Sequence, residues 1–253
     1  MEKINLSRLK NCMARAQRGE ELTIGFLGGS ITQGSLATEH ENTYAYRVFT
    51  WWKETFPNAE FHYVNGGIGG TTSHYGVSRA VTDVLMYQPD FVVVDFSVND
   101  EPDEFFQETY EGVIRKLLQW KSEPAVVILN NVFYDTGKTA QDFHNAVGNW
   151  YQVPHVSIKD TLYQEIQQGK YTREELTPDG LHPNDKGHKL VAEKIIAFLE
   201  EVRSHVAEPE DELTFPEPMT QNAYENARRL TIREISPELA GFRADTEEKT
   251  GHL

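Results

Sequence analysis

The feature of this sequence that most constrains its fold is the run Phe91-Val-Val-Val-Asp-Phe96, which is apolar at almost every position. A strand with one face in solvent alternates apolar and polar residues, whereas a nearly continuous apolar run is typical of a strand covered on both faces. Similar short runs, rich in β-branched and aromatic residues, recur along the chain and predict further strands. The expected strands are Leu22–Leu27, Glu60–Val64, Phe91–Phe96, Ala125–Leu129 and His155–Ile158.

The segments between these runs have helical character. In the last of them, Leu190, Val191, Ile195, Phe198 and Leu199 recur at helical spacing and form one apolar face. Strands that alternate with crossover helices predict the α/β class, with a parallel sheet and helices on both of its faces. Besides an N-terminal helix around Cys12, the expected helices are Tyr44–Thr55, Ser73–Tyr87, Glu104–Trp120, Ala140–Tyr151, Asp160–Gln168 and Asp185–Val202.

Length, charge and cysteine content narrow the class of protein. A chain of 253 residues can bury one substantial core. A formal charge of −15 argues against nucleic acid and anionic membranes as partners, since both are polyanions. No apolar run is long enough to span a membrane. Cys12 is the only cysteine, so no intramolecular disulfide can form, and the first residues lack the apolar core of a secretory signal. We therefore expect a cytoplasmic protein.

The composition changes near Ser204, which divides the chain into a domain of residues 1–203 and an extension of residues 204–253. The extension begins acidic and proline-containing, as linkers are. Gln221–Arg229 is expected to form one short helix, whereas Ala240–Leu253 has no clear period. Two interpretations of the extension remain open: the start of a truncated further module, or a tail that packs back onto the domain.

Ser30 follows the first expected strand in Gly28-Gly-Ser30-Ile-Thr32. The two glycines allow a tight turn, and a helix starting here would place the serine at its N-terminus, where negative charge is favoured. An ordinary strand-to-helix turn with serine as N-cap is the plainer alternative. A phosphate loop is disfavoured because Ser35 stands where the motif requires lysine, and the hydrolase nucleophile elbow because Thr32 replaces its second glycine.

Two further segments follow expected strands. Asn65-Gly-Gly-Ile-Gly-Gly70-Thr is not a dinucleotide fingerprint, because Thr72 stands in place of its third glycine. Its bare backbone can offer N–H donors to an oxyanion, although a flexible loop explains it equally well. Ser97-Val-Asn99-Asp100 closes the third strand, at the sheet edge where ligands bind in open parallel sheets. Asn99 carries a neutral amide donor, though Asn and Asp are also common turn residues.

Asp179-Gly-Leu-His182-Pro places a carboxylate and an imidazole three residues apart. Pro183 keeps His182 out of the following helix and on a loop, where its side chain can face a cleft. Asp185 and His188 continue the spacing and suggest a metal site, but the proline interrupts the helix that would bring the four together. We expect no metal and no cofactor. The remaining histidines are interpreted as surface or packing residues: His40, His62, His74, His144, His155, His205 and His252.

Together, the four segments resemble the SGNH hydrolases, also called the GDSL esterase/lipase family, over about Thr23 to Val202. The resemblance implies a flavodoxin-like three-layer α/β/α sandwich with a five-stranded parallel sheet. It also implies that Ser30 is the nucleophile, His182 the base and Asp179 its orienting acid. The N–H groups of Ser30 and Gly70 and the side chain of Asn99 would form the oxyanion hole. In one departure from the family, Gly29 stands where the name-giving aspartate usually lies.

We therefore expect an ester hydrolase that forms an acyl-serine intermediate and acts on a small-molecule or carbohydrate ester. No lipid-sized apolar insertion separates the blocks, which favours small acyl groups such as acetyl. A lipase, lysophospholipase or thioesterase is the alternative enzyme, and a non-catalytic carbohydrate-binding protein is an alternative of another class. The oligomeric state is left open. Aromatic residues that could include a sugar-stacking platform, or form core, are Tyr44, Trp51, Trp52, Tyr75, Tyr134 and Trp150.

Overall fold

A computed structural model describes residues 4–209, 211, 213–230, 232–241 and 243. Its centre is one five-stranded sheet in the order β2-β1-β3-β4-β5, and every neighbouring pair is parallel. The order reverses between β1 and β3, which is the place where open α/β sheets bind ligands. The strands are β1 (Glu21–Gly28), β2 (Glu60–Gly67), β3 (Phe91–Asp95), β4 (Ala125–Asn130) and β5 (His155–Ser157).

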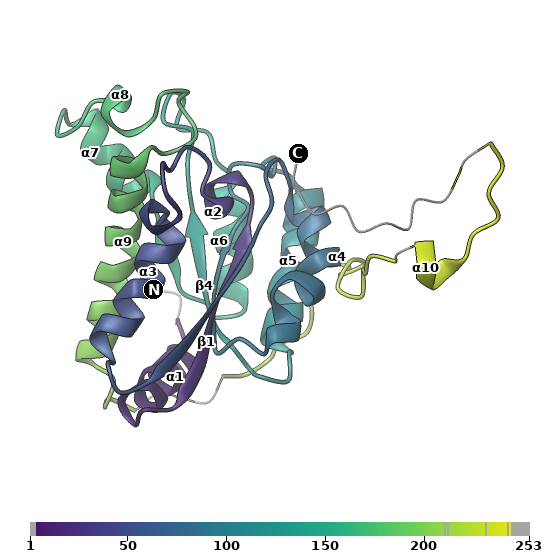
Figure 1. Cartoon of the computed structure of the whole chain (residues 1–253), viewed down its shortest axis with the longest axis horizontal. Helices are drawn as coiled ribbons and strands as arrows, with labels where there is room; N and C mark the ends of the chain where they lie inside the picture. The colour runs from purple at the N-terminus through teal and green to yellow at the C-terminus, as the bar shows by residue number, and fades with distance from the viewer. Residues whose placement is uncertain (1–3, 210, 212, 231, 242, 244–253) are drawn as a thin grey trace.

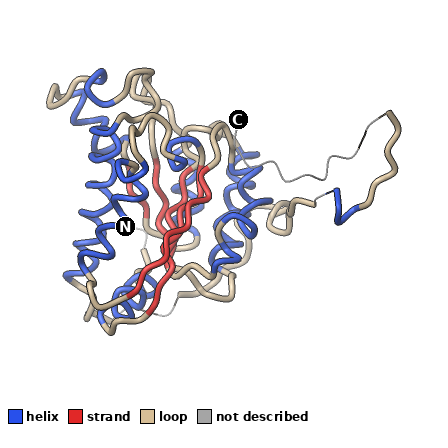
Figure 2. Tube along the Cα trace, in the orientation of Figure 1, coloured by secondary structure: helices blue, strands red, loops and turns tan. Residues whose placement is uncertain are grey.

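Helices cover both faces of the sheet and give the molecule three layers (Figure 1). On one face lie α1 (Ser7–Gln17), α3 (Tyr44–Thr55) and α9 (Asp185–Ser204); on the other lie α4 (Ser73–Asp83), α5 (Glu104–Leu118) and α6 (Gln141–Trp150). Figure 2 shows the strands running between these two layers. The expected three-layer α/β/α architecture with a five-stranded parallel sheet is confirmed. Shorter elements are α2 (Ser30–Gln33), α7 (Gln164–Gln167), α8 (Arg173–Leu176), α10 (Ile232–Ile235), the 3₁₀ turns His40–Asn42 and Leu85–Tyr87, and the π-helical turn Lys159–Tyr163.

Strand β3 explains why the apolar run is continuous. Phe91 and Val93 pack in the core beneath α3 and α9, whereas Val92 and Val94 pack in the core beneath α4 and α5. All residues of β3 are buried. Burial on both faces therefore replaces the apolar–polar alternation of a half-exposed strand. The same burial fixes the strand at the centre of the sheet, where its carboxyl end lies beside that of β1.

Residues 213–229 of the extension pack against the helices α4 and α5, and the helix expected at Gln221–Arg229 is absent. Its backbone groups bond to distant side chains instead: Glu111 accepts from Met219 N at 2.6 Å, and Glu108 accepts from Ala223 N at 2.9 Å. Asn222 has a φ of 53°, which no α-helix accommodates. Long-range contacts thus override the local helical tendency. We name the segment Leu213–Arg229 the C-terminal strap; α10 lies beyond it, and the expectation for Ala240–Leu253 lies mostly outside the described residues.

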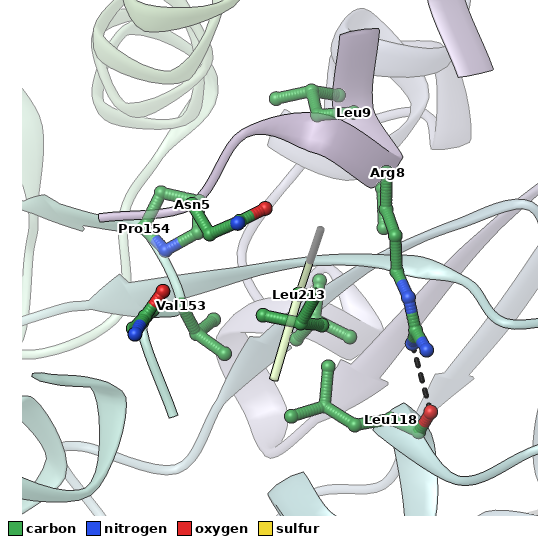
Figure 3. A pocket seen from close by; sticks show the side chains of 10 residues that line it. Asn5, Arg8, Leu9, Leu118, Val153, Pro154 and Leu213 are labelled. Carbon is green, nitrogen blue, oxygen red and sulfur yellow. Dashed lines mark hydrogen bonds between the residues drawn. The ribbon is translucent and has the colours of Figure 1, made fainter. Parts of the chain in front are cut away.

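The strap begins near the amino-terminal end of β4, at the opposite end of the sheet from Ser30. A small cavity lies there between α1, the start of β4 and Leu213 (Figure 3). Arg8 closes one side by donating to the Leu118 carbonyl at 2.8 Å. The volume of about 20 Å³ is close to the space that one water molecule needs. This cavity is therefore a packing feature at the junction of domain and strap, and it is too small for a substrate.

Candidate active site

Ser30 lies at the carboxyl end of β1, where the chain turns into the single helical turn α2. Its hydroxyl is 2.8 Å from His182 Nε2, although the two residues are 152 positions apart in the sequence. The preceding turn is held to the neighbouring strand, because Gly29 N donates to the Asp95 carbonyl. Since α2 has only four residues, its dipole is small, and the donors around Ser30 matter more than the helix terminus that the sequence suggested.

His182 is held between Ser30 and Asp179. Its Nδ1 is 2.7 Å from Asp179 Oδ2 and donates to that carboxylate, which leaves the Nε2 lone pair facing the serine hydroxyl. The second carboxylate oxygen accepts from His182 N at 2.8 Å and from Leu181 N at 3.0 Å. Burial raises the pKa of Asp179, but the hydrogen bonds from His182 and Leu181 outweigh it and hold that pKa below its usual range. The acid therefore stays ionised.

The glycine loop after β2 and the side chain of Asn99 lie close to the turn that holds Ser30. A Cβ atom placed on Gly69 would lie 3.7 Å from Ser30 Cβ, so the glycine loop after β2 runs directly beside the serine. Gly70 has a φ of 70°, a conformation that favours glycine, and open space on its side-chain face. Asn99 lies against Gly29, the neighbour of Ser30. Among the described residues, the backbone N–H groups of Ser30 and Gly70 and the side-chain amide of Asn99 form no hydrogen bond.

Arg79 is a residue that sequence reasoning missed. Its guanidinium is fully buried and donates to the carbonyls of Gly28 at 2.7 Å and Gly66 at 2.5 Å. It also donates to Thr71 Oγ1 at 3.0 Å and pairs with Asp83 at 2.9 Å. One side chain on α4 therefore joins the end of β1, the end of β2 and the glycine loop. No short sequence motif indicates this role, because it depends on three segments that come together only in the folded protein.

A buried pair behind the site was also missed. Asp100 accepts from Ser73 N at 2.8 Å, which fixes the start of α4 directly after the glycine loop. Its other oxygen is 3.0 Å from His144 Nε2, and the His144 ring stacks on Tyr110 with centroids 3.6 Å apart. The interpretation of His144 as a packing residue agrees with its complete burial. The pairing of Asp100, in the segment Ser97–Asp100, with His144 of α6 could not, however, be predicted from the sequence.

Asp185 and His188 do not approach Asp179 and His182 to form a metal site. Asp185 accepts from Thr38 N and Thr38 Oγ1 at 2.8 and 2.7 Å. His188 is buried, accepts from Tyr44 N and donates to the Ser35 carbonyl at 3.2 Å. Both residues thus hold the loop that follows α2. Within the described part of the chain, no group of three or more His, Cys, Asp or Glu side chains could hold a metal ion.

Most of the candidate stacking aromatics are core residues. Tyr44, Trp51, Trp52 and Tyr134 are buried. Tyr75, at the start of α4, is 39% exposed and contacts the guanidinium groups of Arg79 and Arg229. Trp150 is 49% exposed and donates from its indole nitrogen to the Glu217 carbonyl of the strap. Of the six, only Tyr75 combines exposure with a place on a helix that starts at the site.

Known proteins that resemble this chain in sequence and structure include esterases. The sequence profile of the GDSL-like lipase/acylhydrolase family matches residues 26–190. A two-domain esterase (CEX) active on acetylated mannans, solved with mannopentaose, is 48% identical, with a TM-score of 0.93 over 98% of this chain. A second structure of the two-domain esterase (CEX) active on acetylated mannans is also 48% identical, with a TM-score of 0.95 over 98% of this chain. This chain spans 66% of the first of these structures and 67% of the second, about two thirds of their length.

More distant structures share the fold. An acetylxylan esterase from Geobacillus stearothermophilus is 15% identical, with a TM-score of 0.61 over 72% of this chain and 96% of its own. The acetyl xylan esterase AlAXEase is 22% identical, with a TM-score of 0.58 over 70% of this chain and 99% of its own. A search of curated proteins found no match. At these identities the two distant structures support the fold alone.

Proposed function

We propose that this chain, which belongs to the GDSL-like lipase/acylhydrolase family, is a serine ester hydrolase. It would remove acetyl and other small acyl groups from a carbohydrate-like substrate. The observation that carries the proposal is the continuous chain of hydrogen bonds from Ser30 Oγ through His182 to Asp179. A nucleophile, a base and an orienting acid in this order are what acyl transfer through an acyl-serine requires.

In the proposed mechanism, Ser30 Oγ attacks the ester carbonyl while its proton passes to His182 Nε2. The carbonyl oxygen becomes an oxyanion that accepts from Ser30 N, Gly70 N and the Asn99 amide. When the tetrahedral intermediate collapses, the bond to the alcohol oxygen breaks and His182 returns the proton to the leaving alcohol. Water then attacks the acyl-Ser30, its proton passing to His182, and the carboxylic acid leaves as Ser30 is reprotonated.

Asp179 stabilises the imidazolium that forms in both halves of this cycle. Its ionised carboxylate faces Nδ1, so the charge on the ring is neutralised at the moment when Nε2 holds the proton. The hydrogen bonds from Leu181 N and His182 N keep the carboxylate from rotating away. The role of Asp179 is thus to orient the ring and to compensate charge, and it does not itself take up the proton.

The substrate class follows from the relatives and from the loops around the site. The relative at 48% identity is active on acetylated mannans. In this chain the connections that follow β1, β2 and β3 are short, so these three connections offer little sequence for a lid or a long acyl tunnel. Without such a tunnel, extra methylene groups gain none of the ~0.8 kcal/mol each that burial would contribute. We therefore place acetylated, mannan-like polysaccharides first among the substrates.

A series of p-nitrophenyl esters from acetyl to dodecanoyl, measured together with acetylated mannan and a lysophospholipid, tests this proposal. We expect kcat/KM to be highest for acetyl and acetate to be released from the polysaccharide. A maximum at octanoyl or longer would favour the lipase or thioesterase alternative. Ligand binding without turnover on any of these esters would instead favour a non-catalytic carbohydrate-binding protein.

We further propose that residues 1–203 form the catalytic domain and that residues 204–253 serve as its C-terminal extension. The compartment that we propose is the cytoplasm, in keeping with a single, buried cysteine; fractionation of cells that express the full protein tests this. Among the described residues, no helix is both long and apolar enough to cross a membrane.

A further inference from the structure

We propose that Gly29 is a positioning residue for Asn99: the missing side chain at position 29 leaves the space that the Asn99 amide occupies beside Ser30. This inference rests on the proposed function, in which the amide donates to the oxyanion. It concerns a position at which the segment around Ser30 departs from the sequence pattern of the family. It gives that departure a physical reason.

The geometry at Gly29 is unusually specific. A Cβ atom placed on Gly29 would overlap Asn99 Oδ1 and would lie 3.3 Å from Asn99 Cγ. The next atom, the carbonyl oxygen of Thr71, would be 3.6 Å away, an ordinary contact distance. Asn99 is therefore the only obstacle to a side chain here among the nearest neighbours.

The backbone at this position does not use the left-handed conformation that favours glycine. Gly29 has a φ of −90°, which residues with a side chain adopt readily, and a ψ of −149°, which lies beyond the usual β range. Positions such as Gly34 and Gly70, with φ of 102° and 70°, differ in this respect. The closest steric obstacle to a side chain at position 29 is Asn99.

Asn99 cannot yield by moving its backbone, because Asn99 N and Asp100 N both donate to the Phe96 carbonyl, at 3.0 and 2.9 Å. A side chain at position 29 would therefore rotate the Asn99 amide away from the nucleophile and leave the strand ends in place. The expected defect is a loss of oxyanion stabilisation, which lowers kcat while substrate binding is retained.

The neighbouring glycine provides a matched control. A Cβ atom on Gly28 would lie 2.6 Å from the Asp95 carbonyl oxygen, which is backbone, and 2.9 Å from Thr32 Cβ. Gly28→Ala should therefore disturb the junction of β1 and β3 and lower the thermal stability whatever residue stands at position 99. Gly29→Ala should act on kcat through residue 99.

A double-mutant cycle tests the inference, with kcat, KM and Tm measured for wild type, Gly29→Ala, Asn99→Ala and the doubly substituted protein. We expect Gly29→Ala to lower kcat by about tenfold or more, against the ~10²–10³-fold typical of a lost oxyanion donor, with KM and Tm nearly unchanged. In the Asn99→Ala background, the space is empty, and Gly29→Ala should cause no further loss.

Full kcat in Gly29→Ala would overturn the inference, and so would an equal loss of kcat with and without Asn99. If Gly29→Ala fails to fold, Asn99→Ala in the same chain should restore folding, and failure to restore it also contradicts the inference. Ser30→Ala is measured in parallel. Activity in that variant would reject the proposed function, whereas an inactive Ser30→Ala beside a fully active Gly29→Ala would reject only the role of Gly29.

Discussion

In the proposed mechanism, the Asn99 side chain and the backbone N–H groups of Ser30 and Gly70 donate to the substrate oxygen on which negative charge develops. A donor that is used mainly in the transition state affects turnover more than ground-state binding. We therefore expect Asn99→Ala to lower kcat by about 10²–10³-fold while KM changes much less. Steady-state kinetics with p-nitrophenyl acetate measures both constants. Equal changes in kcat and KM, or none, would remove Asn99 from the oxyanion site.

Asp179 fixes which nitrogen of His182 carries the proton. Substitution with asparagine keeps the size of the side chain but removes the charge and lets an amide face Nδ1, which permits the wrong tautomer. Asp179→Asn should therefore lose activity by several orders of magnitude, about 10⁴-fold in a comparable triad, with its thermal unfolding close to that of wild type. Asp185→Asn, a nearby acid that bonds only to the loop after α2, is the control and should keep most activity.

His188 predicts a pH dependence of stability. Burial lowers its pKa to about 4, although its hydrogen bond to the Ser35 carbonyl opposes this. Because the folded-state pKa is below the unfolded value, the unfolded chain takes up the proton first as the pH falls below about 6.5. The stability due to neutral His188 is full above that pH and is lost progressively as the pH falls through 4.

Preferential protonation of His188 in the unfolded chain should lower the free energy of unfolding by about 2 kcal/mol between pH 7 and pH 5. Asp95 acts in the opposite direction, since burial raises its pKa to about 6. Its contribution is therefore present at acidic pH and is lost as the pH rises through about 6. Urea unfolding of wild type and His188→Gln at both pH values isolates the histidine, because Asp95 is common to both. Identical pH slopes would contradict the role of His188.

At the level of helices and strands, Arg79 should determine whether the ends of β1 and β2 stay in register with the glycine loop. Arg79→Met removes a buried cation from four acceptors and leaves Asp83 and two carbonyls without it. We expect the free energy of unfolding to fall by about 3–5 kcal/mol, with kcat reduced as well. Urea unfolding measures the first effect and ester hydrolysis the second.

Arg229 is the matched control for Arg79. It also pairs with Asp83, at 3.0 Å, but its side chain is 37% exposed. A partly exposed pair of this kind contributes about 0–1 kcal/mol. Arg229→Met should therefore have a small effect, and equal destabilisation by the two substitutions would show that burial of Arg79 is unimportant.

The strands were predictable from the sequence because their apolar runs are local signals. Helix α3 begins and ends at the residues expected for it, Tyr44 and Thr55. Ser30, Asp179 and His182 could be selected as candidates because each lies in a compact motif; their catalytic roles stay predictions. Arg79 and the Asp100–His144 pair were not predictable, since their partners are distant in sequence. The prediction of a helix at Gln221–Arg229 was wrong for the same reason, because its partners Glu111 and Glu108 lie more than 100 residues away in the sequence.

For the whole molecule, the C-terminal strap is expected to be part of the stable fold. Glu111 is fully buried and accepts from Thr220 N at 2.9 Å and from Tyr151 Oη at 2.5 Å, and Arg115 pairs with Glu225 at 2.9 Å. Without the strap these buried charges lose partners. Loss of one partner of a buried ion pair costs about 3–5 kcal/mol. A chain that ends after Val206 should therefore show a much lower Tm, measured by circular dichroism.

A chain that ends after Leu230 keeps the whole strap and is the control. Leu230 is 46% exposed and follows the last residue of the strap, so a cut after it keeps the contacts of Glu111 and Arg115 with the strap. This chain should match the Tm and kcat of the full protein. If the two shortened chains are equally stable, the strap adds nothing to the fold.

The proposed reaction depends on an acyl-serine intermediate at Ser30. Its most direct test is rapid acid quenching of the protein during turnover of p-nitrophenyl acetate, followed by peptide mass spectrometry. We predict that the mass of one acetyl group is found on the peptide that contains Ser30, and that His182→Ala fails to accumulate it. Acetyl found on another residue, or full turnover by a protein in which Ser30 is alanine, would contradict the proposed mechanism.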